Sequence, residues 1–168
     1  MMSLSQSVRA PMIDILVEAG QWPARAKLRA LIERAVEAAL AAAKPPLAAG
    51  SELSLLFTDD AHLRRLNHRY RDKDSATNVL SFPAPPATAG MFGPLLGDLV
   101  LAEETIAREA AAGGLAFDDH LAHLVVHGLL HLLDYDHDDD AEASVMEGLE
   151  IDILGRLGIA DPYGGGAG

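Results

Sequence analysis

The sequence predicts a single α+β domain, in which a small mixed sheet of about four strands packs with about five helices. The chain has 168 residues, which is enough for one domain with its own core. Hydrophobic residues make up 49% of the chain, and short β-branched segments alternate with longer segments of helical periodicity. We expect this domain to span residues 11–163, between a flexible N-terminus (1–10) and a disordered Gly-rich tail (164–168).

Four short segments are expected to be strands because they are rich in aliphatic and β-branched residues. The first has isoleucine or valine at alternate positions, and the third ends at Pro83. The order of the strands in the sheet does not follow from the sequence. The expected strands cover residues 13–18, 52–58, 78–82 and 96–102.

Five segments are expected to be helices. The first is rich in alanine and starts near Pro23, whose fixed φ suits a first helical turn. The second is capped by Thr58 or Asp59. The last is expected to bury one apolar stripe, made of Val145, Leu149, Ile153 and Leu157. The expected helices cover residues 23–43, 59–71, 103–112, 118–133 and 141–157.

Composition excludes several classes of protein. The chain has no cysteine, so disulfides and thiolate ligands are excluded. No apolar segment is long enough to span a membrane, and the N-terminus does not resemble a signal peptide, so we expect a cytoplasmic protein with no membrane partner. The net charge is −12: residues 1–73 carry 11 Lys/Arg and 8 Asp/Glu, whereas residues 74–168 carry 2 and 17. This balance argues against broad, nonspecific affinity for nucleic acid.

The segment His127 to His137 (HGLLHLLDYDH) has the strongest chemical signal. His127 and His131 are four residues apart, so they share one face of a helix. A turn after Leu133 could bring His137 back as a third ligand for one divalent metal, with a coordination position left open for catalysis. The alternative is that these histidines act separately on a polar helix face and pair with nearby aspartates.

Two more histidines lie on the same helix face. His123 is expected to support the metal site through hydrogen bonds, because it is too far along the helix axis to join His127 and His131 as a ligand. His120 is expected at the surface. Gly128 stands where zinc peptidases have the glutamate of His-Glu-x-x-His, which argues against peptide hydrolysis. It either leaves room for substrate or permits close helix packing.

A basic cluster precedes the third strand. Five of the 13 basic residues fall between Arg64 and Lys73, among them Arg69 and Arg71. Guanidinium groups suit phosphate recognition and stabilise charge on a phosphoryl group in transfer. The alternative is a solvated helix face with local Arg–Asp pairs.

These motifs resemble those of the YbeY family of bacterial rRNA-maturation endoribonucleases. The resemblance covers about residues 50–163 and rests on YRDKDSATNVLSFP, LGDLVLA, HGLLHLLDYDH, MEGLE and the Asp161-Pro162-Tyr163 ending. It implies an α+β domain with one zinc ion per chain, held by His127, His131 and His137. It also implies metal-dependent cleavage of single-stranded RNA, in rRNA end processing and ribosome quality control.

By this resemblance, Arg71 and the metal ligand His127 are the catalytic residues. The basic cluster itself leads us to expect that Arg69, Arg71 and Lys73 bind substrate. RNA, rRNA precursors and the ribosome or its proteins are the implied partners. Asp98 and Asp136 are candidates for proton transfer. Asp134 replaces a glycine of the family pattern at a position that often needs positive φ, and we expect the site to tolerate it.

Two other functions fit the same residues. One is a metallohydrolase of another substrate class, such as a peptidase, which the absent glutamate disfavours. The other is a non-catalytic ribosome-assembly factor whose metal is structural.

Overall fold

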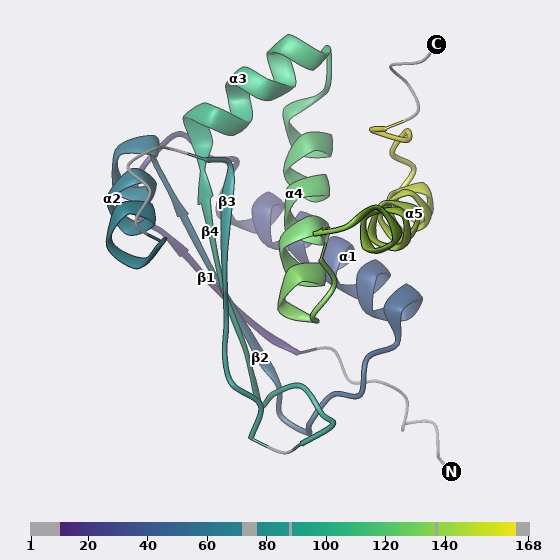
Figure 1. Ribbon diagram of the computed structural model, residues 1–168. Helices are drawn as coiled ribbons and strands as arrows, with labels where there is room; N and C mark the ends of the chain where they lie inside the picture. The colour runs from purple at the N-terminus through teal and green to yellow at the C-terminus, as the bar shows by residue number, and fades with distance from the viewer. Residues whose placement is uncertain (1–10, 72–76, 88, 137, 164–168) are drawn as a thin grey trace.

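In the part of the chain that the structure describes, nine elements form one α+β domain around a four-stranded mixed sheet (Figure 1). The computed structural model describes residues 11–71, 77–87, 89–136 and 138–163, with only the backbone of residues 70 and 71. The elements are β1 (Met12–Val17), α1 (Arg25–Ala43), β2 (Glu52–Thr58), α2 (Asp60–Arg71), β3 (Val79–Pro83), β4 (Leu95–Ala102), α3 (Glu103–Gly113), α4 (Phe117–Leu132) and α5 (Asp140–Arg156). The predicted fold class is therefore confirmed. The segments expected to be flexible or disordered, 1–10 and 164–168, lie outside the described residues.

The sheet has the strand order β1-β2-β4-β3. β1 and β4 both pair in parallel with β2, whereas β3 pairs antiparallel with β4. β3, which follows the basic segment in the chain, contacts α4, the histidine helix. The antiparallel pairing with β4 places β3 at the edge of the sheet, and the sequence does not predict this pairing.

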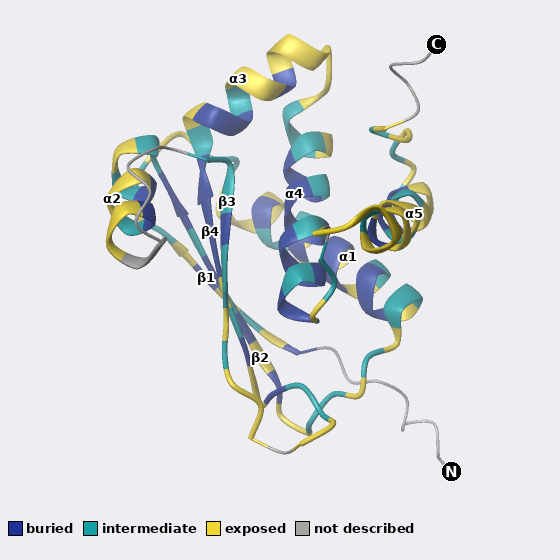
Figure 2. Ribbon diagram, in the orientation of Figure 1, coloured by how far each residue is buried: buried dark blue, intermediate teal, exposed yellow. Residues whose placement is uncertain are grey.

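Two cores lie on opposite faces of the sheet. On one face, Leu55, Leu99 and Leu101 pack against α1 and α4 in the main core. On the other face, α2 buries Leu63 over Val100 in a smaller cluster. Figure 2 shows the buried surfaces turned towards the sheet and the exposed ones away from it. Along the described ranges, no helix has both the length and the apolar character needed to cross a membrane.

Two details of the predicted elements are wrong. The first helix begins at Arg25 rather than Pro23, which precedes the cap residue Ala24. In α5, Val145 is 60% exposed, and the buried stripe consists of Met146, Glu150, Ile153 and Leu154. The stripe thus contains a carboxylate, a polar residue that a search for apolar periodicity passes over.

Candidate active site

The second half of α4 brings two imidazoles together. His127 and His131 lie one turn apart, and their Nε2 atoms are 3.1 Å from each other. Both side chains are partly buried, because the opposite face of α4 packs into the main core through Val125, Val126, Leu129 and Leu130. The predicted sharing of one helix face is therefore observed.

Glu150 of α5 supports this pair from behind. Its residue is fully buried, and Oε2 accepts a hydrogen bond of 2.6 Å from Nδ1 of His127. Oε1 accepts a hydrogen bond of 2.9 Å from Nε2 of His123 and another from the hydroxyl of Tyr163. A buried carboxylate with three donors is well satisfied.

The same contacts set the charge of Glu150. Burial alone would raise the pKa of its carboxyl, but the hydrogen bonds from His123, His127 and Tyr163 outweigh burial and lower this pKa to about 2. Burial and the hydrogen bond to Glu150 also raise the pKa of the Tyr163 phenol above its usual range. Glu150 is therefore an acceptor only, and the Tyr163 hydroxyl is a donor.

The carboxylate determines which nitrogen of His127 carries the proton. Because Glu150 can only accept, Nδ1 of His127 is the protonated nitrogen, and Nε2 presents its lone pair on the side of His131. Two nitrogens that each lie ~2.0–2.1 Å from one tetrahedral zinc are about 3.3–3.4 Å apart. The observed 3.1 Å is close to this separation, and a carboxylate behind a ligating histidine is the usual support of such a site. The two histidines therefore fit a shared divalent metal.

Among the described residues, no group of three or more His, Asp or Glu side chains is arranged to hold a metal ion. His137, the predicted third ligand, lies outside the described residues, as does Lys73. Arg71 ends α2, but its side chain is also outside them. Arg69 is exposed and lines a surface hollow of about 430 Å³ on α2 with Arg65.

The sheet separates α2 from the histidine pair, since α2 packs on the face opposite α4. Asp98 also points to the α2 face, into a groove of about 560 Å³ with Phe82 and Leu66. Burial there raises the pKa of Asp98. Its neighbour Leu99 instead faces α4, so this alternation removes Asp98 as a proton-transfer group for the histidines. Asp136 stays a candidate, in the turn after α4.

Gly128 permits close packing of α4 on the sheet, and it does not leave room for substrate. A Cβ at this position would lie 2.8 Å from Cδ2 of Leu99 and 3.3 Å from Oγ of Ser81. Ser81 in turn donates a hydrogen bond of 3.3 Å to the carbonyl of Gly128. The glycine faces β3 and β4 rather than an open site, so it lets α4 approach the sheet.

Asp134 adopts the backbone conformation expected at a glycine position. Its φ is +71°. The N–H of Asp134 donates to the carbonyl of His131 (3.1 Å) and the N–H of Tyr135 donates to that of Leu130 (3.0 Å), which is the Schellman pattern of a helix C-terminus. The chain therefore turns sharply immediately after the histidine pair, without the glycine that this turn favours.

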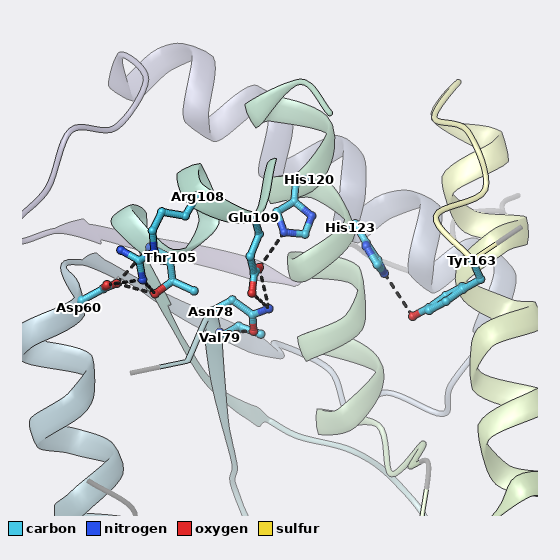
Figure 3. A network of polar contacts seen from close by, with 9 residues as sticks. All are labelled: Asp60, Asn78, Val79, Thr105, Arg108, Glu109, His120, His123 and Tyr163. Atoms are coloured by element: carbon cyan, nitrogen blue, oxygen red, sulfur yellow. Dashed lines mark hydrogen bonds and ion pairs between the residues drawn. The ribbon is translucent and has the colours of Figure 1, made fainter. Parts of the chain in front are cut away.

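α3 connects the histidine helix to the start of β3, as Figure 3 shows. Glu109 accepts hydrogen bonds of 2.9 Å from Nε2 of His120 and 3.0 Å from Nδ2 of Asn78. The prediction that His120 lies at the surface is wrong, because its side chain is only 11% exposed. Within the described ranges, its buried Nδ1 has no hydrogen-bond partner. His123, in contrast, makes a hydrogen bond of the kind expected of it, to Glu150, the carboxylate that also contacts His127.

Sequence reasoning missed two residues of this site, Glu150 and Tyr163. Both lie in motifs that carry the family resemblance, MEGLE and the Asp161-Pro162-Tyr163 ending, but the sequence predicts no role for either residue. The available signal was the position of Glu150, which shares one helix face with Met146 and Leu154. A carboxylate on a buried stripe needs a donor, and the histidine helix is the richest source of donors.

A histidine pair whose ring N–H is held by a buried carboxylate is the usual arrangement of a metal-binding protein. The family model for Endoribonuclease YbeY matches residues 16–158. The chain belongs to the YbeY family of endoribonucleases.

Known relatives are similar in sequence to this protein over most of its length. It is 56% identical over 158 residues to Endoribonuclease YbeY of Rhizobium meliloti (strain 1021), covering 90% of this chain and 94% of the relative. It is 52% identical over 159 residues to the protein of the same name from Rhizobium johnstonii, covering 91% and 93%. The solution structure of TM1509 from Thermotoga maritima shares the fold, with a TM-score of 0.54 and 21% identity over 90% of this chain and 99% of that one.

Proposed function

We propose that this protein is a zinc-dependent endoribonuclease that cleaves single-stranded RNA during rRNA maturation and ribosome quality control. The observation that carries the proposal is the His127–His131 pair, backed by Glu150, in a chain of the YbeY family. His127, His131 and His137 hold one zinc ion per chain. The ion, when bound, supplies Lewis acidity towards water and phosphoryl oxygens.

The chain's own residues orient the metal ligands, bind the RNA phosphates and neutralise charge on the reacting phosphodiester. Glu150 keeps the proton on Nδ1 of His127, so that Nε2 remains available as a ligand. The guanidinium of Arg71 stabilises negative charge on the phosphodiester as it reacts. Arg69 and Lys73 bind neighbouring phosphates. The role of Arg71 rests on its place in the family pattern, and β3, the next element after α2, contacts the histidine helix.

The charge of the protein fits a restricted RNA-binding surface. With a net charge of −12, the chain gains affinity for RNA only where its basic residues gather, and five of 13 lie between Arg64 and Lys73. Binding to rRNA precursors is then aided by the ribosome or its proteins. We place this activity in the cytoplasm.

The test is cleavage of a labelled single-stranded RNA by identically purified wild-type protein and three variants: His127→Ala, Arg71→Ala and Glu37→Gln. Glu37 is an exposed residue of α1 and serves as the control. Wild type and Glu37→Gln should cleave, whereas His127→Ala and Arg71→Ala should lose most activity and keep the wild-type circular dichroism spectrum. Equal cleavage by wild type and His127→Ala would contradict the proposal.

The same proteins separate the two rival functions. A peptidase would digest casein, and this digestion would not respond to Arg71→Ala. An assembly factor with a structural metal would unfold when a chelator removes the metal, and it would show no RNA cleavage for His127→Ala to abolish.

A further inference from the structure

The C-terminal end of the described chain reaches the carboxylate that supports the histidine pair. The hydroxyl of Tyr163 donates to Oε1 of Glu150 and lies 3.4 Å from Nε2 of His123. The Tyr163 ring meets the His123 ring edge to face, with centroids 5.7 Å apart and an interplanar angle of 90° (Figure 3). The backbone N–H of Tyr163 donates to Oδ1 of Asp161 at 2.7 Å, which fixes the turn that presents this ring.

The two oxygens of Glu150 have different partners. Oε1 accepts from Tyr163 and His123, whereas Oε2 accepts from His127. A carboxylate is rigid and planar, so donors that hold Oε1 also fix the direction in which Oε2 faces. The orientation of the His127 ring therefore depends on contacts made on the far side of Glu150.

Tyr163 also covers this carboxylate. Glu150 is 0% exposed, whereas Tyr163 is 42% exposed, so the tyrosine forms the outer layer of the network. Hydrogen bonds are stronger when water is kept away from them. The hydroxyl and the ring thus act together, one as a donor and the other as a cover.

We propose that Tyr163 is a positioning residue of the metal centre: it fixes Glu150 so that His127 presents Nε2 beside His131, and it thereby strengthens metal binding. The C-terminal segment 161–163 is then part of the site, although it follows the last helix. This inference rests on the proposed function, because it requires that the histidines bind zinc.

The test measures zinc affinity, in competition with a chelator, for metal-free wild-type protein and for Tyr163→Phe, Glu150→Gln and Glu37→Gln. Loss of one net hydrogen bond should weaken zinc binding by Tyr163→Phe about two- to tenfold. Loss of the carboxylate should weaken it about 10–100-fold in Glu150→Gln. Glu37→Gln, on the exposed side of α1, should bind like the wild type.

The outcomes separate the two proposals. If the wild type binds zinc and Tyr163→Phe binds it equally well or more tightly, the role of Tyr163 is overturned but the proposed function is not. Absence of zinc binding in the wild type overturns the proposed function and this inference together. Thermal unfolding of each metal-free protein provides the folding control, and an affinity loss in Tyr163→Phe at an unchanged unfolding midpoint supports positioning rather than general stability.

Discussion

Oε2 of Glu150 lies 2.6 Å from Nδ1 of His127, although the two residues are 23 positions apart in the chain. This contact joins α5 to the histidine pair on α4. It fixes the tautomer of His127, because an ionised carboxylate can accept a hydrogen bond but cannot donate one.

Glu150→Gln should change the tautomers of the supporting histidines. Glutamine has one acceptor oxygen and an NH₂ group, so it cannot accept on both sides from His123, His127 and Tyr163. The ring that faces the NH₂ group must then present a bare nitrogen. Histidine ring ¹⁵N chemical shifts of the metal-free protein should show a changed tautomer at His123 or His127, and the unchanged wild-type pattern would contradict the assignment.

Gly128→Ala should destabilise the protein by roughly 1–3 kcal/mol, the usual cost of overpacking a core. The new Cβ would lie 2.8 Å from Cδ2 of Leu99. Gly148 on α5 offers a matched control, since nothing lies within 4 Å of a Cβ there. Gly148→Ala should stabilise the helix by ~0.5–1 kcal/mol. Urea unfolding of both variants gives the comparison, and equal effects would argue against close packing at Gly128.

Gly128→Glu, which restores the His-Glu-x-x-His pattern of zinc peptidases, should not create a peptidase. The side chain would be directed at Leu99 and Ser81, and it would bury a charge without a partner. We expect lower yield of folded protein and no casein digestion.

Asp134→Gly should stabilise the protein by about 0.5–1 kcal/mol, because glycine relieves the strain of a positive φ. Lys44 has a φ of +49° at the C-terminus of α1 and provides a second site of the same kind, away from the histidines. Lys44→Gly should give a similar gain. Thermal unfolding would show a higher midpoint for both variants, and a lower midpoint for Asp134→Gly would mean that its side chain makes a stabilising contact.

Glu109→Ala should destabilise the protein by about 0.5–1.5 kcal/mol, because it removes the acceptor of Nε2 of His120, whose side chain is largely covered. It should also raise the KM for RNA, since Glu109 anchors Asn78 directly after the segment that carries Lys73. Glu37→Ala, at an exposed glutamate of α1, is the control for both measurements. Wild-type stability and KM in Glu109→Ala would show that this connection has no role.

Much of the fold could be predicted from the sequence because periodicity is a local property. The alternation of strands and helices was correct, and so was the placement of His127 and His131 on one helix face. The expectation of positive φ at Asp134 was also correct, since it rests on helix-end chemistry that a few residues determine. The roles of Arg69, Arg71, Lys73 and His137 stay predictions.

Two of the errors concern polar residues that the structure covers, Glu150 and His120. Hydrophobic periodicity places Val145 inside and predicts no role for Glu150, whereas Val145 is exposed and Glu150 is buried. His120 was expected at the surface, yet its side chain is largely covered and bonded to Glu109. Glu150 is buried because donors from α4 and the C-terminal segment satisfy both of its oxygens. Among the described residues, His120 has a hydrogen-bond partner only at Nε2, which is Glu109 of α3.

The sequence by itself determined the elements, the shared face of the two histidines and the family signature, since all of these follow from spacing along the chain. Only the tertiary structure decided the strand order, the packing role of Gly128 and the assembly of Glu150, His123 and Tyr163 behind His127. The physical reason is that a buried carboxylate is stable only where distant donors converge on it. Such convergence depends on how α4, α5 and the C-terminal segment pack, and spacing along the chain does not specify it.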